Sequence, residues 1–158
     1  MKYTRLTKEQ LEELHPEFIN FLAAQSIDKK EWDEIKLNKP EVALQEVDFF
    51  SDLIWDKALT NVKFIDHFSK NYIFLFKCHS EYLESIIVNT TKDEVDFFTA
   101  EGIQWLSENL FSNEVTIQSG KKKVSNNRNE EIFKIIENGG IISKGELHSK
   151  LITLINIA

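Results

Sequence analysis

Residues 62–89 constrain the fold most strongly, because apolar residues form three short alternating runs there, separated by polar segments. In the central run, successive side chains point to opposite sides. One side carries Tyr72, Phe74, Phe76 and Cys78, and the other carries Ile73, Leu75, Lys77 and His79. Aromatic and β-branched residues pack well on a pleated sheet. We therefore predict a central strand that is covered on one face and partly covered on the other.

The runs before and after this strand complete a predicted three-stranded meander. The strands are expected at residues 62–68, 72–79 and 83–89. The segments 69–71 and 79–81 between them have the length of hairpin turns. A fourth strand is expected from either residues 94–98 or residues 115–118, and the pattern leaves both open.

Helices are predicted on the N-terminal side of this meander, within residues 1–60. Capping boxes begin the first two helices, formed by Thr7 with Gln10 and by Asp28 with Glu31. Pro16 lacks an amide hydrogen and disfavours helical geometry at the preceding residue, so we expect a kink or break there. Pro40 is a favourable first residue and opens a third helix that runs to about residue 60.

Further helices are predicted after the meander. Thr99 caps a helix that ends near Leu110, and residues 130–138 form a helix that Gly139 and Gly140 terminate. The expected caps of that second helix are Ser125, Asn126 and Asn127. A capping box of Ser143 and Glu146 begins the last helix. Residues 119–123 are expected to form an exposed basic loop after the candidate strand at 115–118.

Together these elements predict an α+β protein in which a small antiparallel sheet of three to four strands packs with N-terminal helices and a C-terminal helical pair. A length of 158 residues with 42% hydrophobic residues suffices for one core, so we predict a single domain over residues 1–158. Its parts are a helical part (1–60), a sheet-centred part (62–118) and a basic helical tail (119–158).

The net charge of -7 is unevenly distributed along the chain. Residues 1–60 hold 8 basic and 13 acidic side chains, residues 61–118 hold 4 and 9, and residues 119–158 hold 7 and 4. Such asymmetry is found at some binding surfaces, but soluble proteins without a partner carry it as well, so both readings stay open.

Asp48, Asp52 and Asp56 recur every four residues along the predicted third helix. Like charges at this spacing destabilise a helix by roughly a few tenths of a kcal/mol per pair, so local helix stability does not explain the three aspartates. We predict an acidic ridge that meets a basic partner or a cation, and the alternative is a solvated helix face. Phe49 and Trp55 are the candidate anchors of a protein interface, because bulky aromatics beside charges are typical of interface centres. The alternative is that both belong to the core.

Lys121, Lys122, Lys123 and Arg128 form a basic segment just before residues 131–151. Residues 131–151 resemble the first two helices of a winged helix-turn-helix domain. The resemblance implies nucleic-acid binding through phosphate contacts as an alternative function. In that family a recognition helix and a wing follow, whereas this chain ends at Ala158, so a simple packing pair of helices is the other reading.

Catalytic and metal-binding signatures are sparse. His67, Cys78 and His79 come near one another in the predicted hairpin, but adjacent Cys78 and His79 point to opposite faces and do not share a metal without a bulge. The sequence has no CxxC, HExxH, glycine-rich phosphate loop or GxSxG motif. We predict no catalytic residue, no metal site and no cofactor.

Cys78 is the single cysteine, which excludes an internal disulfide and favours a buried thiol in the reducing cytoplasm. No window approaches the roughly 18 apolar residues that a membrane span needs, so no membrane association is predicted.

The opening of the chain resembles a family of short uncharacterised proteins from Bacteroidetes-type bacteria, catalogued as a domain of unknown function. The residues that carry the resemblance are Met1-Lys2-Tyr3, Arg5-Leu6-Thr7, Glu9-Gln10-Leu11-Glu12-Glu13-Leu14, Glu17-Phe18, Phe21-Leu22, Lys122-Lys123, Ser125 and Glu131-Ile132-Phe133. Pro16 stands where an unbroken helix is expected in the family. The resemblance implies a bacterial, cytosolic protein and contributes no activity or site.

These observations favour a non-enzymatic interaction or regulatory protein that binds another macromolecule. The expected partner is a protein, basic where it meets the acidic ridge, and nucleic acid at the basic segment is the alternative. A homo-oligomer is compatible with the sequence.

Overall fold

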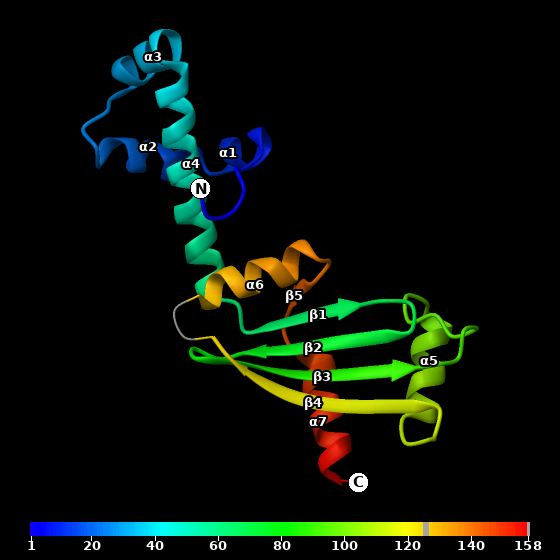
Figure 1. Ribbon diagram of the computed structural model, residues 1–158. Coiled ribbons are helices and arrows are strands. Elements are labelled where there is room, and N and C mark those ends of the chain that lie inside the picture. Colours follow the sequence, from blue (N-terminus) through cyan, green and yellow to red (C-terminus); the bar gives the residue numbers. More distant parts are fainter. Residues whose placement is uncertain (125–126, 158) are drawn as a thin grey trace. The chain divides into compact units, whose positions relative to one another are not determined.

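The structure is a computed structural model that describes residues 1–124 and 127–157 (Figure 1). The chain divides into two compact units, Met1–Thr60 and Asn61–Ala158, and each is described by itself. The first unit is helical and the second contains a five-stranded sheet with helices, so the fold class is α+β, as predicted.

The first unit contains the helices α1 (Lys8–Glu13), α2 (His15–Ala23), α3 (Lys29–Asn38) and α4 (Pro40–Thr60). Both predicted capping boxes are present, at Thr7 and at Asp28. The predicted break at Pro16 is also confirmed, because α1 ends before Leu14 and Pro16 lies in the first turn of α2. A proline is tolerated there, since the first amides of a helix have no carbonyl partner within the helix.

Aromatic side chains fill the core of the first unit. Leu6, Phe18, Leu22 and Phe50 are buried. The Phe18 ring lies 5.0 Å from the Phe50 ring and 5.3 Å from the Trp32 ring, measured between centroids. The core therefore joins the N-terminal segment and α2 to α3 and α4.

The sheet of the second unit has the strand order β4-β3-β2-β1-β5, and every neighbouring pair is antiparallel. The strands are β1 (Phe64–Phe68), β2 (Tyr72–Cys78), β3 (Tyr82–Thr90), β4 (Val115–Lys123) and β5 (Ile141–Ser143). The predicted meander is confirmed as β1, β2 and β3. The predicted number of strands is too low, because residues 141–143 add a strand at the edge of the sheet beside β1.

The fourth strand comes from the second of the two candidate segments. Residues 94–98 form turns, whereas residues 115–118 begin β4. The predicted basic loop at 119–123 is wrong, because β4 continues to Lys123 and pairs with β3 along its whole length. An edge strand accommodates consecutive lysines, since their long side chains reach solvent.

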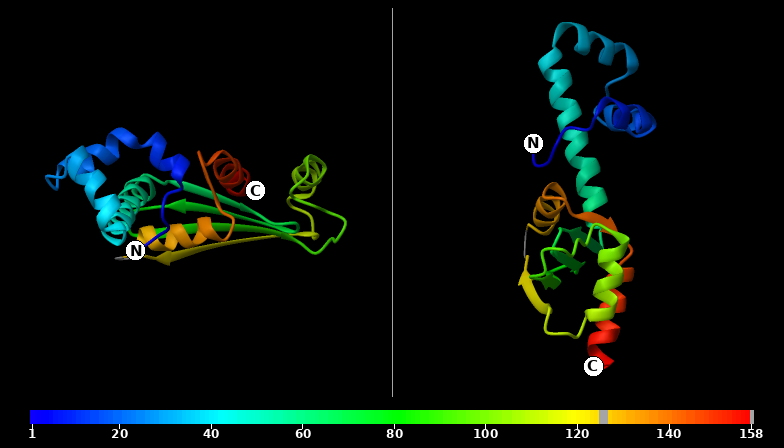
Figure 2. Two further views of the ribbon diagram at one scale, coloured as in Figure 1. Left: turned by 90° about the horizontal axis from the view of Figure 1, so that it is seen from above. Right: turned by 90° about the vertical axis from the view of Figure 1, so that its right-hand side faces the viewer.

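One face of the sheet is buried and the other is only partly covered, as predicted for the central strand. Ile73 and Leu75 of β2 are fully buried, while Tyr72 on the opposite face is 38% exposed and Phe74 is half-buried. The buried face packs against α5 (Ala100–Asn109) and α7 (Glu146–Ile157), which lie on the same side of the sheet in Figure 2. The core side of β2 is therefore the side of Ile73 and Leu75, which ends with the charged Lys77.

The helix boundaries of the second unit confirm most of the predicted caps. Thr99 caps α5 by accepting a hydrogen bond from the Gly102 amide at 3.0 Å. The next helix, α6 (Arg128–Glu137), starts two residues earlier than expected and stops before Gly139, whose φ of 109° suits glycine. The expected caps Ser125 and Asn126 lie outside the described residues, and Asn127 caps α6 without a side-chain hydrogen bond.

The predicted capping box at Ser143 is wrong. Ser143 ends β5, and α7 begins only at Glu146. The Ser143 hydroxyl instead donates to Asp66 Oδ1 at 3.0 Å and accepts from the Gly145 amide at 3.1 Å. Pairing of residues 141–143 with β1 takes Ser143 out of reach of the helix start.

Candidate functional site

The three aspartates of α4, here called the acidic edge, bind the N-terminal segment of their own unit. Asp48 receives two hydrogen bonds from Arg5, from Nε at 2.6 Å and from Nη2 at 3.1 Å. Asp52 accepts from the backbone amides of Lys2 at 2.9 Å and Tyr3 at 3.1 Å. The basic group expected opposite the acidic edge is therefore present within the chain.

Asp56 completes the acidic edge. It accepts a hydrogen bond from the Tyr3 hydroxyl and lies 3.5 Å from Lys2 Nζ. The hydrogen bond from Arg5 holds the pKa of Asp48 below its usual value, more strongly than burial raises it. Tertiary contacts with residues 2–5 thus explain why three aspartates recur every four residues although their mutual repulsion destabilises the helix.

The two predicted aromatic anchors lie in different environments. Trp55 is half-buried, packs against the core of the first unit and lies 6.5 Å from the Tyr3 ring. Phe49 is 62% exposed, and Leu53, one turn later, is 54% exposed. Phe49 and Leu53, here called the apolar stripe, project from the same side of α4 because residues four apart share a helix face. Only Phe49 of the two predicted anchors is available to a partner.

The four residues of the basic segment also have different roles. Lys121 Nζ lies 3.5 Å from Glu84 Oε1, and Lys122 Nζ lies 3.0 Å from Glu131 Oε2. Lys123 has no carboxylate partner among the residues that the structure describes.

Arg128 supports the backbone of the second unit. Its Nε donates to the His79 carbonyl at 2.7 Å and its Nη2 donates to the Val62 carbonyl at 2.7 Å. These two bonds join the start of α6 to the entry of β1 and the end of β2. A third donor, Nη1, binds the Asn129 side-chain oxygen at 3.1 Å, so the guanidinium is engaged within the second unit.

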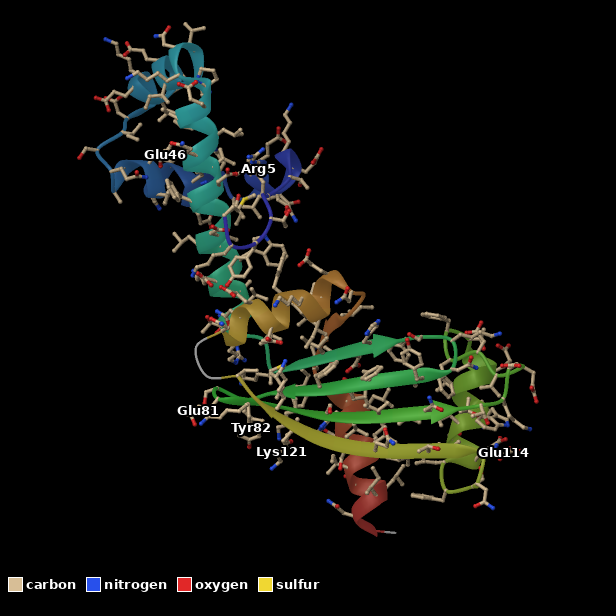
Figure 3. All side chains as sticks on the ribbon, viewed as in Figure 1. Arg5, Glu46, Glu81, Tyr82, Glu114 and Lys121 are labelled. Atoms are coloured by element: carbon tan, nitrogen blue, oxygen red, sulfur yellow. The ribbon has the colours of Figure 1, made fainter. Side chains whose placement is uncertain are left out.

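One end of the buried sheet face carries charge in place of the apolar core. The strand register places Lys77, Glu84 and Lys121 side by side on β2, β3 and β4. His79 Nε2 lies 3.4 Å from Glu84 Oε2, and the His79 ring stacks on Tyr82 at 4.2 Å. Figure 3 shows Tyr82 and Lys121 together near the turn between β2 and β3. We call this region the polar end of the sheet.

His148 of α7 lies over the polar end of the sheet. Its side chain is nearly buried, with the residue 5% exposed, and its ring lies 5.6 Å from that of Phe64. Gly145 makes this placement possible, because its φ is 77° and a Cβ there would stand 2.5 Å from the Phe64 ring. Only glycine fits at this position, because any side chain would collide with the Phe64 ring.

Burial lowers the pKa of His148, and the positive charge of Lys77 lowers it further. Glu84 and Asp66 act in the opposite direction, and His79 adds to the lowering. His148 Nε2 is buried and has no hydrogen-bond partner among the described residues.

A hollow of about 260 Å³ lies between α7 and the strands β3 and β4. His148, Glu84, Ser119 and Lys121 contribute polar groups to its walls. This site was not predicted from the sequence. The register that places Lys77 opposite Glu84 is set by a turn tighter than the predicted one, in which the His79 amide donates to the Tyr82 carbonyl, and His148 has no local pattern that links it to either residue.

The residues considered for metal binding are separate. His67 stacks on Phe74 at 6.1 Å, while Cys78 is buried and His79 faces Glu84. Burial raises the pKa of the Cys78 thiol to about 11, although the nearby Arg128 opposes the rise. Within residues 1–124 and 127–157, no three His, Cys, Asp or Glu side chains cluster as metal ligands. No described helix has both the length and the apolar content to cross a membrane.

These features define a two-unit α+β protein with an acidic, partly apolar helix in one unit and a charged hollow in the other. The chain belongs to a family of unknown function, DUF6495, whose sequence profile matches residues 1–156. The resemblance to a domain of unknown function is thereby confirmed, and the bacterial origin stays a prediction. Neither the curated proteins nor the solved structures contain a match to the chain.

Proposed function

We propose that this protein is a non-enzymatic interaction protein that binds another protein through the apolar stripe of α4. The observation that carries the proposal is the exposure of Phe49 and Leu53, at 62% and 54%, on adjacent turns of one helix. Single exposed apolar residues are ordinary, but a contiguous aromatic and aliphatic pair resembles the anchors of a protein interface.

The charges around the apolar stripe favour a basic partner. Residues 1–60 hold 8 basic and 13 acidic side chains. Asp52, which borders Phe49 on the helix, is bound by backbone amides that carry no formal charge. A partner segment with an apolar side chain beside lysine or arginine would match an apolar centre with an acidic rim.

Nucleic-acid binding through the basic segment is the alternative function. Exposed Lys121, Lys122 and Lys123 support it, whereas the bonds of Arg128 to main-chain carbonyls argue against a role for that residue. Phosphate binding weakens steeply as salt rises, and an apolar interface does not. A cytoplasmic location in a bacterium is also part of the proposal, with the unpaired Cys78 thiol as its support.

The test is affinity capture by the tagged full-length chain from native lysate, with and without nuclease. A double variant, Phe49→Ser with Leu53→Ser, is compared with Leu37→Ser plus Leu44→Ser, which removes two other exposed apolar side chains of the same unit. We expect the wild type and the control to capture the same protein, and the double variant to lose it.

The captured protein is then purified and titrated directly against the three chains at two salt concentrations. We expect the affinity of the wild type to fall only slightly at the higher salt concentration, because salt screens the charged rim but not the apolar centre. We expect the double variant to bind at least tenfold more weakly, about 1.4 kcal/mol. Capture that disappears with nuclease, or that the double variant retains, would contradict the proposal. Thermal unfolding of the variants checks the fold, because surface changes shift stability by no more than about 0.5 kcal/mol.

A further inference from the structure

The polar end of the sheet has an excess of cations in two neighbouring cross-strand rows. The first row holds Lys77, Glu84 and Lys121, and the second pairs Tyr82 with Lys123. These two rows therefore contain three lysines and one carboxylate, that of Glu84, which Lys121 and His79 contact. Such a group of cations beside low-dielectric walls attracts small anions.

The Glu84 carboxylate is already engaged on both oxygens. Glu84 Oε1 lies 3.5 Å from Lys121 and Oε2 lies 3.4 Å from His79. These contacts hold the pKa of Glu84 below its usual value although burial opposes the shift. The neighbouring Asp66 accepts a hydrogen bond from Ser143 and is held by it.

Lys77 is half-buried and has no carboxylate within ion-pair distance among the described residues. Its ammonium lies 5.9 Å from the centre of the Phe64 ring. A partly desolvated ammonium beside an aromatic ring and without a carboxylate partner is stabilised by an added anion.

His148 adds a second, independent observation. It lines the hollow, only 5% of the residue is exposed, and its Nε2 has no hydrogen-bond partner in the part of the chain that the structure describes. A buried polar atom without a hydrogen-bond partner is unfavourable, and a ligand oxygen that pairs with it would remove this penalty.

From these contacts we infer that the polar end of the sheet binds a small oxyanion of the phosphate class, held by Lys121 and His148, which line the hollow, and attracted by the neighbouring Lys77. The oxyanion accepts hydrogen bonds from Lys121 Nζ and from His148 Nε2, and Lys77 contributes charge. The hollow of about 260 Å³ admits a phosphate group with a small substituent and is smaller than the pockets of drug-sized ligands. The site belongs to the second unit and is independent of the proposed function of α4.

The test is a titration of the full chain with inorganic phosphate, at constant ionic strength with chloride as the balancing anion. We expect the Tm to rise saturably with phosphate and the NMR-detected pKa of His148 to increase, because a bound anion favours the imidazolium. The imidazole faces charges from every neighbouring element, namely Asp66, Lys77, His79, Glu84 and Lys121, so the shift is read as a difference between phosphate and chloride.

A double variant, Lys77→Gln with Lys121→Gln, is expected to weaken phosphate binding at least tenfold, or about 1.4 kcal/mol. Lys122→Gln is the matched control, because Lys122 pairs with Glu131 and lies on the opposite face of β4 from Lys121. Equal phosphate responses in the double variant and the control would overturn the inference. If the double variant does not fold, the test is the NMR titration of His148 in the wild type. A His148 pKa that is the same in phosphate and in chloride would overturn the inference.

Glycerol 3-phosphate and acetate separate the sources of the anion. Tighter binding of the phosphate ester than of inorganic phosphate identifies a substituted ligand, and equal binding identifies free phosphate. Equal responses to acetate and phosphate would overturn the assignment to the phosphate class.

Discussion

The acidic edge of α4 and the polar end of the sheet both collect charge, but they use it differently. At the acidic edge, the carboxylates bind cations and amides from residues 2–5, so the charge contributes to the first unit's own structure. At the polar end of the sheet, two cross-strand rows hold three lysines and the Glu84 carboxylate, and a buried imidazole nitrogen has no hydrogen-bond partner among the described residues. A conspicuous charge pattern in a sequence is therefore a weaker guide to binding than the balance of charges after folding.

The sharpest way to test this difference is to remove Arg128, which the sequence groups with the lysines but which the fold uses internally. Arg128→Ala leaves the carbonyls of Val62 and His79 without their donor. We expect the free energy of unfolding of the second unit to fall by about 2–3 kcal/mol. Urea unfolding followed by Cys78 thiol labelling measures it, because that thiol is buried and its pKa is raised to about 11.

The control for this change is Lys122→Ala, which removes only an exposed ion pair with Glu131. Its expected cost is about 0–1 kcal/mol. Equal destabilisation by the two variants would show that Arg128 belongs with the surface lysines after all.

A smaller effect is expected when the acidic edge loses one member. Asp52→Ala removes the acceptor of the Lys2 and Tyr3 amides, and we expect a loss of about 1–2 kcal/mol in the first unit. Hydrogen exchange at these two amides should accelerate. Gln45→Ala, an exposed change on the same helix, should leave exchange unaltered, and equal protection in both variants would mean that the acidic edge does not hold the N-terminal segment.

The smallest expected effect is the pH dependence that His148 introduces. Its pKa in the folded chain is lowered by burial and by Lys77, so the unfolded chain binds the proton more readily. Folding with a neutral His148 therefore contributes its full stability above the ordinary histidine pKa of about 6.5. This contribution is lost as the pH falls from there through the lowered pKa of His148 in the folded chain. Tm measurements between neutral and mildly acidic pH should fall more steeply for the wild type than for His148→Gln. If the two curves of Tm against pH are parallel, His148 is not the cause of the acid destabilisation.

Local patterns in the sequence predicted the elements that depend on neighbouring residues. The capping boxes at Thr7 and Asp28, the break at Pro16 and the stop at Gly139 were confirmed because each depends on contacts within about four residues. The meander was confirmed for the same reason, since short turns set the pairing of β1, β2 and β3.

The candidate sites were less predictable because their partners are distant in the chain. Asp48 and Arg5 are 43 residues apart, and Arg128 and Val62 are 66 apart. No local pattern records such a pairing, so the acidic edge looked available and Arg128 looked like a surface cation. The hollow beneath His148 likewise joins α7 to strands that precede it by about 30–60 residues, a separation that only chain folding closes.

By itself, the sequence determined where helices and hairpins begin and end, because caps, prolines, glycines and alternating side chains act over a few bonds. Only the tertiary structure decided that Ser143 ends a strand, that residues 119–123 extend β4 and which charges meet a partner. Backbone groups of an edge segment and charges of a helix face each have several possible partners, and the packed chain selects among them.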